Sequence, residues 1–433
     1  MNLIEEMKVI KIHINKLGAV RESTVVIKPM MILSGESGLG KSYVAILVHY
    51  FYKFLAEERM QGFFDDKGHD YSSLVAANPN EGAFTINTDE LTAWMKEDAK
   101  KYMCLAIGNN DLVIDVDFEV PFEKKEYTFE YKTVPFGLEG KEEKSHVFQL
   151  EELSMRVSLE TGVKNIGSIP WSMLFQERLC LELLGGSIIN QTFAMVPGRG
   201  SLLNVPITMQ DRIKNNGDIF SEFLSDWYVV RSMPARKRVD KDLVDINGGK
   251  IELDENDNIL YQIGEEKPLP ISAAASSIKE LAPLYMLLDK YPSNQLSILF
   301  EEPEAHLHPQ KQVDIADFVV QAINKGAHMQ ITTHSDYFLR RLNDRIFLFK
   351  IFESNPTLYE ETLKKYKYSD LTINPSLIGA YLLRREKDGN VKVIEQVLEK
   401  GIPYESFYNV IQNESYHSLD IQQTYFSISK KNA

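Results

Sequence analysis

The chain has 433 residues, with 48 Lys and Arg against 62 Asp and Glu, so its formal net charge is -14 at pH 7. Apolar residues make up 44% and charged residues 25%, a globular composition that suits one large core with an insertion, or two domains. This acidic balance argues against non-specific coating of nucleic acid, because neutralising phosphates requires a basic surface. A local basic patch remains compatible with it.

Export and membrane insertion are not indicated. The first residues alternate apolar and polar positions and lack the continuous apolar core of a secretory signal. The longest uncharged run, residues 183–198, is too short to span a bilayer and contains Asn190, Gln191 and Pro197. The two cysteines, Cys104 and Cys180, have no metal-ligand spacing. These features predict a cytoplasmic protein without a membrane segment.

The first part of the chain predicts strands that lead into a helix. Three short apolar segments lie within residues 8–34, and residues 43–55 have apolar positions at helical spacing. Residues 61–190 predict an inserted mixed region with a helix over 88–107. Within it, residues 111–122 and 126–134 alternate at period two, and we expect them to pair as a hairpin.

The second part predicts alternating strands and helices. The expected elements are a hairpin around residues 254–258, a helix over 276–291, a buried strand over 296–300 with a helix after it, a strand over 328–332 with a helix after it, a strand pair around Asp388 and Gly389, and a helix over 403–419. This βαβ order predicts a parallel sheet in an α/β core. We therefore divide the chain into the two parts of this core, 1–60 and 191–350, the insertion 61–190, and a strand–helix extension 351–433.

The segment "GESGLGKS" has the spacing of a phosphate-binding loop between a strand and a helix. The residues that would surround the phosphates are Gly35, Glu36, Ser37, Gly38, Leu39, Gly40, Lys41 and Ser42. The glycines allow backbone N–H groups to point at phosphate oxygens next to a helix N-terminus. In such a loop Lys41 reaches the β and γ phosphates, and Ser42 ligates Mg²⁺. The segment thus predicts an ATP site; a plain glycine-rich turn is the alternative.

Acidic residues end the buried strand of "LSILFEEPEAHLHP". We expect this strand beside the phosphate-loop strand, with Glu301 holding Mg²⁺ and Glu302 orienting and deprotonating the attacking water. The alternative, that acidic residues favour a helix N-terminus, accounts for Glu304. His334 follows the next buried strand, where a neutral imidazole can hydrogen-bond the γ phosphate or the water.

The motifs "GESGLGKS", "ILFEEPEAHLHP" and "TTHSDYFL", in that order, resemble ABC-class ATPases of the RecF, Rad and OLD group, which are often AAA-like ATPases of bacterial defence loci. The resemblance implies an ABC-type P-loop NTPase core and a head-to-tail homodimer, or higher homo-oligomer, that closes on ATP. It also implies a serine-bearing motif that completes the partner's site. Here Ser276 and Ser277 match, although Ile278 replaces the usual glycine. An N-cap without another role is the alternative.

Other candidates have simpler interpretations. Asp115 and Asp117 resemble a nuclease metal pair but fit the solvent face of a strand. His306 and His308 lack helical i, i+4 spacing for zinc and are expected to pack or cap. A basic cluster flanked by Trp227 and Tyr228 is a nucleic-acid contact, a docking surface or a solvated loop; its members are Arg231, Arg236, Lys237, Arg238 and Lys241. Arg199 is a candidate phosphate contact.

Two classes of function remain. The resemblance to ATPases of PARIS, Septu and retron systems favours the sensor or switch subunit of an antiphage, abortive-infection system. Such a subunit responds to a phage-derived trigger protein and controls a separate effector, a toxin or nuclease. No sustained heptads occur, and the roughly 80 residues after the His334 helix are few for a nuclease domain. The alternative is a RecF-like repair ATPase that acts directly on DNA. A scaffold that binds ATP without hydrolysing it is a third interpretation.

Overall fold

The computed structural model describes residues 7–56, 59–69, 80–136, 143–158, 167–203, 217–233, 246, 248–255, 258–403 and 412–424. Its main sheet has nine strands in the order β5-β1-β2-β16-β15-β3-β14-β13-β9. The bounds of these strands are β1 Lys11–Leu17, β2 Val20–Val26, β3 Met30–Gly35, β5 Ile114–Glu119, β9 Gln191–Met195, β13 Leu296–Glu301, β14 His328–Thr332, β15 Ile378–Arg385 and β16 Val391–Glu395.

The main sheet is parallel in one half and mostly antiparallel in the other. Strands β15, β3, β14, β13 and β9 run parallel to one another, whereas β15 pairs antiparallel with β16, and β1 pairs antiparallel with both β2 and β5. Every residue of β3, β13 and β14 is buried, which explains their continuous apolar sequences. This confirms the predicted α/β core with a parallel sheet.

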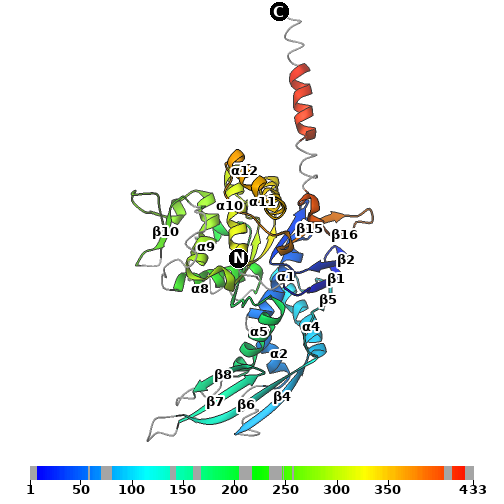
Figure 1. The fold of residues 1–433 in the computed structure, drawn as a ribbon, viewed down its shortest axis with the longest axis vertical. Helices are drawn as coiled ribbons and strands as arrows, with labels where there is room; N and C mark the ends of the chain where they lie inside the picture. Colours follow the sequence, from blue (N-terminus) through cyan, green and yellow to red (C-terminus); the bar gives the residue numbers. More distant parts are fainter. Residues whose placement is uncertain are drawn as a thin grey trace, which may run out of the picture.

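Helices pack on this sheet and on the two smaller sheets (Figure 1). They are α1 Lys41–Ala56, α2 Arg59–Asp66, α4 Thr88–Ile107, α5 Ile169–Leu183, α6 Arg199–Leu202, α8 Ile219–Ser232, α9 Ser276–Lys290, α10 Pro309–Asn324, α11 Asp336–Ser354 and α12 Pro356–Tyr366, with 3-10 turns at Ile271–Ala273, Ser293–Gln295, Pro375–Leu377 and Leu398–Lys400. Helix α1 packs on β3, β14, β13 and β9. The helices predicted over 88–107 and 276–291 are confirmed.

The predicted neighbour of the phosphate-loop strand is wrong. Strand β13, which ends in Glu301, does not pair with β3, because β14 lies between them and pairs with both. The crossover through α10 returns the chain to the position beside β13 that adjoins β3. The strand that precedes His334 is therefore the central one of the three.

A second sheet has the order β4-β6-β7-β8 and lies at the lower end of the molecule in Figure 1, below α5. Its strands are β4 Glu81–Asn87, β6 Glu126–Phe136, β7 Glu143–Leu150 and β8 Leu153–Ser158. Aromatic rings from this sheet, α2 and α5 pack together; among them are Phe64, Phe84, Phe129, Trp171 and Phe175. This sheet, α2 and α5 make up much of the predicted insertion.

The hairpin predicted within the insertion is wrong. Strand β5 pairs with β1 of the main sheet, and β6 pairs with β4 and β7 of the second sheet. Alternation at period two identified both strands but carries no information on their partners. Residues 114–119 thus extend the main sheet, although they lie inside the predicted insertion.

The third sheet and the C-terminal strands complete the fold. Strands β10 Lys250–Leu253 and β11 Ile259–Gln262 form the predicted hairpin, to which β12 Leu269–Pro270 adds. The strand pair predicted around Asp388 and Gly389 is β15 and β16. Strand β15 also pairs parallel with β3, over residues 378–383. The C-terminal part of the chain therefore contributes directly to the core next to the phosphate loop.

Candidate nucleotide-binding site

The phosphate loop connects β3 to α1, as predicted. Gly35, Gly38 and Gly40 have φ values of 129°, 75° and 91°, conformations that L side chains rarely adopt. A Cβ on Gly35 would also lie 2.5 Å from the carbonyl oxygen of Leu383 in β15. Glu36, Ser37 and Gly38 are exposed at the loop tip, while Leu39 is buried beneath it. The backbone thus needs glycine where the motif has it.

Lys41 is the first residue of α1 and is 6% exposed. Its Nζ donates to the carbonyl oxygens of Gly35 and Glu36 at 3.0 and 2.9 Å, which holds the ammonium over the loop. Burial lowers its pKa, while the nearby carboxylates of Glu302, Glu304 and Glu301 act in the opposite direction. The Lys41 ammonium therefore lies close to the carboxyl groups of Glu301, Glu302 and Glu304.

Glu301 and Ser42 meet below the loop. Glu301 is 3% exposed and is hydrogen-bonded by the Ser42 hydroxyl, and its burial raises the pKa of the carboxyl. Its Oε2 is buried without a hydrogen-bond partner in the described part of the chain. A buried carboxylate oxygen with no partner, next to a hydroxyl, is a donor set that suits Mg²⁺. Ser42 and Glu301 fit the predicted metal site on this ground.

Three strand ends lie level at this edge of the sheet. Glu301 of β13 is opposite Thr332 of β14, and Thr332 is opposite Leu33 of β3. Thr333, the residue that follows β14, donates its N–H to the Leu33 carbonyl at 3.1 Å. The phosphate loop, the acidic pair and His334 consequently follow three adjacent parallel strands at their carboxyl ends, where ligands of such sheets bind.

Glu302 directly follows β13 and has a strained backbone. Its φ is 44°, in the left-handed region that is unfavourable for a residue with a Cβ. Its N–H donates to the Thr332 carbonyl at 3.0 Å, and its own carbonyl accepts from Ala305 N at 3.0 Å. His306 in the same loop has φ 59°. Strained backbone conformations of this kind are common at functional sites, where the surrounding structure stabilises them.

His334 follows β14 and is half-buried. Burial lowers the pKa of its imidazole, and the Lys41 ammonium lowers it further, while Glu302 opposes the shift. The imidazole is therefore neutral at pH 7, as its predicted role requires. Its backbone N–H donates to Glu304 Oε1 at 2.5 Å. Glu304 is not at a helix N-terminus, since α10 begins at Pro309, so that interpretation of Glu304 is wrong.

Arg199 does not reach the phosphate loop. The side chain is fully buried, and its guanidinium donates to the carbonyl oxygens of Glu280, Val196 and Glu301 at 2.8, 3.1 and 2.9 Å. It lies 4.8 Å from the ring centroid of Phe300. Burial lowers its pKa to about 10, which leaves it charged at neutral pH. Arg199 thus joins α9 to the end of β13 and is not the predicted phosphate contact.

Ser276 and Ser277 are the first two residues of α9. The N-cap is Ala275, and no side chain caps this end of the helix. Ser276 is exposed and Ser277 is half-buried. The alternative interpretation, in which a serine serves as the N-cap, is therefore wrong. The role of the two serines in a partner's site stays a prediction.

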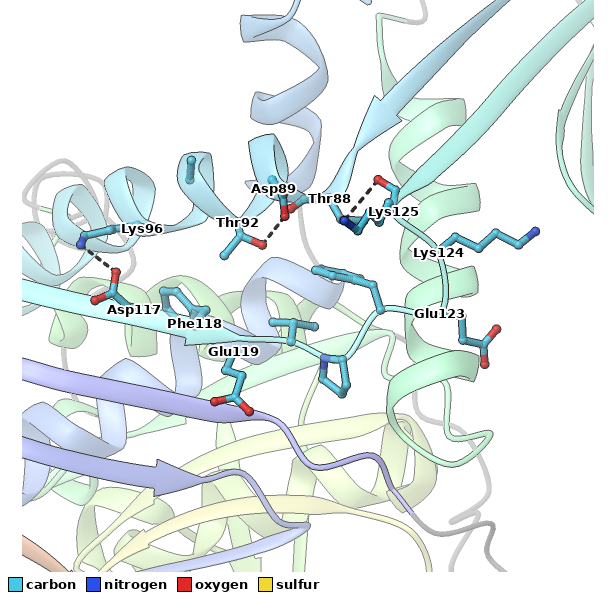
Figure 2. Close-up of a pocket in the computed structure, with 14 residues that line it drawn as sticks. Thr88, Asp89, Thr92, Lys96, Asp117, Phe118, Glu119, Glu123, Lys124 and Lys125 are labelled. Carbon is cyan, nitrogen blue, oxygen red and sulfur yellow. Dashed lines mark hydrogen bonds and ion pairs between the residues drawn. The ribbon is translucent and has the colours of Figure 1, made fainter.

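Asp115 and Asp117 lie on β5 and do not form a metal pair. Lys96 Nζ of α4 contacts Asp115 and Asp117 at 3.1 and 2.7 Å, and Asn15 also donates to Asp117. Asp117 lines a cavity of about 590 Å³ between α4 and the end of β5 (Figure 2). The hydrogen bond from Lys96 lowers the pKa of Asp117. These ion pairs agree with the solvent-face interpretation.

The remaining candidates do not add to the site. The ring of His308 caps α10 by accepting from Gln310 N at 3.3 Å, which agrees with its expected capping role. Within the described ranges, no group of three or more His, Cys, Asp and Glu side chains is arranged to hold a metal. No described helix is long and apolar enough to cross a membrane. Of the basic cluster, Arg231 lies in α8, and the other four residues lie outside the described ones.

The AAA ATPase domain is the family whose model matches this chain, over residues 202–339. The match includes Glu301, Glu302 and His334 but not the phosphate loop. No curated protein matches the chain. The strand order and the phosphate loop define an α/β fold of the P-loop NTPase type, and the match over residues 202–339 supports an ATPase of ABC/AAA-like kind.

Solved structures of SMC head domains are similar to this chain at low identity. One is the SMC head bound to the C-terminal winged-helix domain of ScpA, with 13% identity over 91% of this chain and 99% of that one, at a TM-score of 0.37. A head from Thermotoga maritima has 9% identity over 90% and 100%, at 0.32. A head with an extended coiled coil, bound to the C-terminal domain of ScpA and derived from Pyrococcus furiosus, has 12% over 93% and 98%, at 0.35. The fold assignment depends on the observed strand order and not on these likenesses.

Proposed function

We propose that this chain binds and hydrolyses ATP with Mg²⁺ and uses the cycle as a conformational switch. The observation that carries the proposal is the meeting of Lys41, Glu301, Glu302 and His334 at the carboxyl ends of three adjacent parallel strands. The matched ATPase domain supports it. The backbone of residues 35–42 surrounds the phosphates, and Lys41 neutralises charge on the β and γ groups.

The acidic residues and His334 have separate roles in this proposal. Ser42 and Glu301 hold Mg²⁺, which when bound neutralises charge on the phosphate oxygens. Glu302 accepts a proton from the attacking water and orients it in line with the γ phosphate. The neutral imidazole of His334 hydrogen-bonds the γ phosphate or this water. Loss of the γ phosphate therefore changes the contacts of His334.

We propose that two copies close over the nucleotide, as the resemblance to ABC-class ATPases implies. Ser276 and Ser277 would then approach the γ phosphate bound to the other copy. Ser276 is exposed at the N-terminus of α9, and no side chain caps this end of the helix. The first backbone N–H groups of α9 can therefore bind an anion. Hydrolysis would reopen the pair, which makes the assembly state depend on ATP.

The biological setting that we propose is the switch subunit of a bacterial antiphage, abortive-infection system in the cytoplasm. In it, a phage-derived protein acts as the trigger, and the ATP-dependent assembly restrains or releases a separate toxin or nuclease. Support comes from the resemblance of the three motifs to defence-associated ATPases. A plaque assay with the native locus tests this setting: protection should require Lys41, and a locus with Lys41→Ala that protects fully would contradict it.

The enzymatic proposal is tested by the steady-state ATPase rate of the purified chain, with and without linear duplex DNA. Glu302→Gln is expected to abolish turnover and retain ATP, because the amide cannot accept the proton of water, and the ATP-bound dimer should persist in size-exclusion chromatography. A variant with the parental rate would remove Glu302 from the mechanism. Strong stimulation of the parent by DNA would favour the RecF-like repair function instead.

Binding is tested separately by Lys41→Ala. Loss of the ammonium removes the cation that faces the phosphates, so we expect ATP affinity to fall below detection in calorimetry. Lys100→Ala, which removes a surface ammonium that pairs with Glu97 at 2.7 Å, is the control and should retain ATP affinity. Unchanged affinity in Lys41→Ala would contradict the phosphate-loop assignment.

A further inference from the structure

One carboxylate joins the loop after β13 to the turn after β14. Glu304 Oε1 accepts from His334 N at 2.5 Å and from Thr333 Oγ1 at 3.0 Å. Thr333 Oγ1 in turn accepts from Ser335 N at 3.0 Å. A single oxygen of Glu304 therefore fixes, directly or through one hydroxyl, three consecutive residues that include His334.

The requirements of the local fold do not explain Glu304. It precedes α10 by five residues, and His308 caps that helix. Glu304 is half-buried, and its Oε2 is buried without a hydrogen-bond partner among the residues that the structure describes. Burial of a carboxylate is unfavourable unless its contacts compensate for the lost hydration. Besides a hydrogen bond from its own backbone N–H, the contacts that compensate here come from Thr333 and His334, on the turn after β14.

We propose that Glu304 is a positioning residue that holds the backbone of residues 333–335, so that the His334 imidazole faces the nucleotide beside Glu302. The inference rests on the function proposed above. Glu302 N donates to the Thr332 carbonyl at 3.0 Å, so the two loops are also joined on the side of the attacking water. Glu304 adds the second point of attachment, beyond Thr332, and thereby limits rotation of the turn.

This role needs a hydrogen-bond acceptor at residue 304 and not a negative charge. Glu304→Gln retains an oxygen that can accept from His334 N and Thr333 Oγ1, whereas Glu304→Ala removes it. A displacement of about 1 Å at a catalytic group can lower turnover by about 100-fold. We therefore expect Glu304→Ala to lower kcat between about 10-fold and about 100-fold with unchanged ATP affinity, and Glu304→Gln to recover most of the rate.

A double-mutant cycle with His334→Ala separates positioning from a general structural effect. If Glu304 acts through His334, Glu304→Ala has little further effect on kcat once the imidazole is absent. Losses that multiply in the double variant would overturn the inference. Asp314→Ala is the matched control, because Asp314 is a carboxylate of α10 that contacts Gln310 and Lys311 outside this turn.

The measurements are the ATPase rate, ATP affinity and thermal midpoint of each variant in the full-length chain. If Glu304→Ala does not fold, Thr333→Val carries the test, because it removes one of the two contacts and should lower kcat by a smaller factor. A parent without Glu302-dependent turnover overturns the proposed function together with this inference. If turnover of the parent depends on Glu302 and Glu304→Ala keeps the parental kcat, this inference alone is overturned. The same holds for parental kcat in Thr333→Val where that variant carries the test.

Discussion

Replacement of the buried Arg199 by methionine is expected to destabilise the protein without weakening ATP binding. The substitution removes the donors that three buried carbonyl groups accept from, and leaves the Glu280 carboxylate, 3.7 Å from the guanidinium, without its cation. Glu280 is 2% exposed, so water does not replace the lost partner. Methionine has a similar length, which limits the cavity that forms.

The magnitude follows from two routes. Removal of one partner of a buried ion pair costs about 3–5 kcal/mol. Three unsatisfied carbonyls at about 1–3 kcal/mol each would cost about 3–9 kcal/mol, but a carbonyl has two acceptor positions, so the lower end applies. We therefore expect a loss of about 3–5 kcal/mol, a large part of the roughly 5–15 kcal/mol that stabilises a typical protein.

The assay is urea unfolding followed by tryptophan fluorescence, together with calorimetric titration of ATP. Arg199→Lys should lie between the parent and Arg199→Met, and Glu280→Gln in the Arg199→Met background should recover part of the loss because the buried charge is removed. Arg384→Met is the control for an exposed arginine and should leave the unfolding midpoint unchanged. Parental stability of Arg199→Met combined with lost ATP affinity would refute the reasoning and restore Arg199 as a phosphate contact.

Two further predictions concern titration and reactivity. Burial and the Lys41 ammonium lower the pKa of His334, so its imidazole stays neutral to a lower pH than an ordinary histidine. The His334-dependent part of the ATPase rate should therefore be constant from about pH 8 to about pH 6.5 and decline only at lower pH. A decline centred above about pH 6.5 in the parent, and absent in His334→Gln, would contradict this. Burial raises the pKa of the Cys180 thiol to about 12, whereas Cys104 is half-buried. Iodoacetamide should therefore label Cys104 first and Cys180 only after unfolding, and mass spectrometry would show this order. Equal labelling in the native protein would show that the region around Cys180 opens.

Local patterns were sufficient to predict the phosphate loop and the type of most elements. The loop is recognisable because its backbone conformation needs glycine at defined positions, and these lie within eight consecutive residues. Buried strands such as β13 and β14 are continuous apolar runs, and amphipathic helices such as α9 follow the helical period. Each of these signals depends only on neighbours along the chain.

The partners of the strands were decided by the tertiary structure. Strand β14 lies between β3 and β13, β5 joins β1, and β15 from the C-terminal part pairs with β3. Alternation and burial specify which face of a strand is apolar, but every apolar strand of similar length fits the same neighbouring position. The choice among them depends on contacts between segments that are far apart in the sequence.

The same distinction holds within the site. The sequence by itself identified Lys41, Glu301, Glu302 and His334 as candidates, because each occupies a motif position after a strand or at a loop. It did not identify the contact of Glu304 with His334, which joins residues 30 positions apart. Nor could it separate a phosphate contact from a structural role for an arginine, because only the folded chain shows whether the guanidinium meets backbone carbonyls or solvent. Hydrogen bonds between distant segments form only once packing has excluded water, and this is why the tertiary structure decides them.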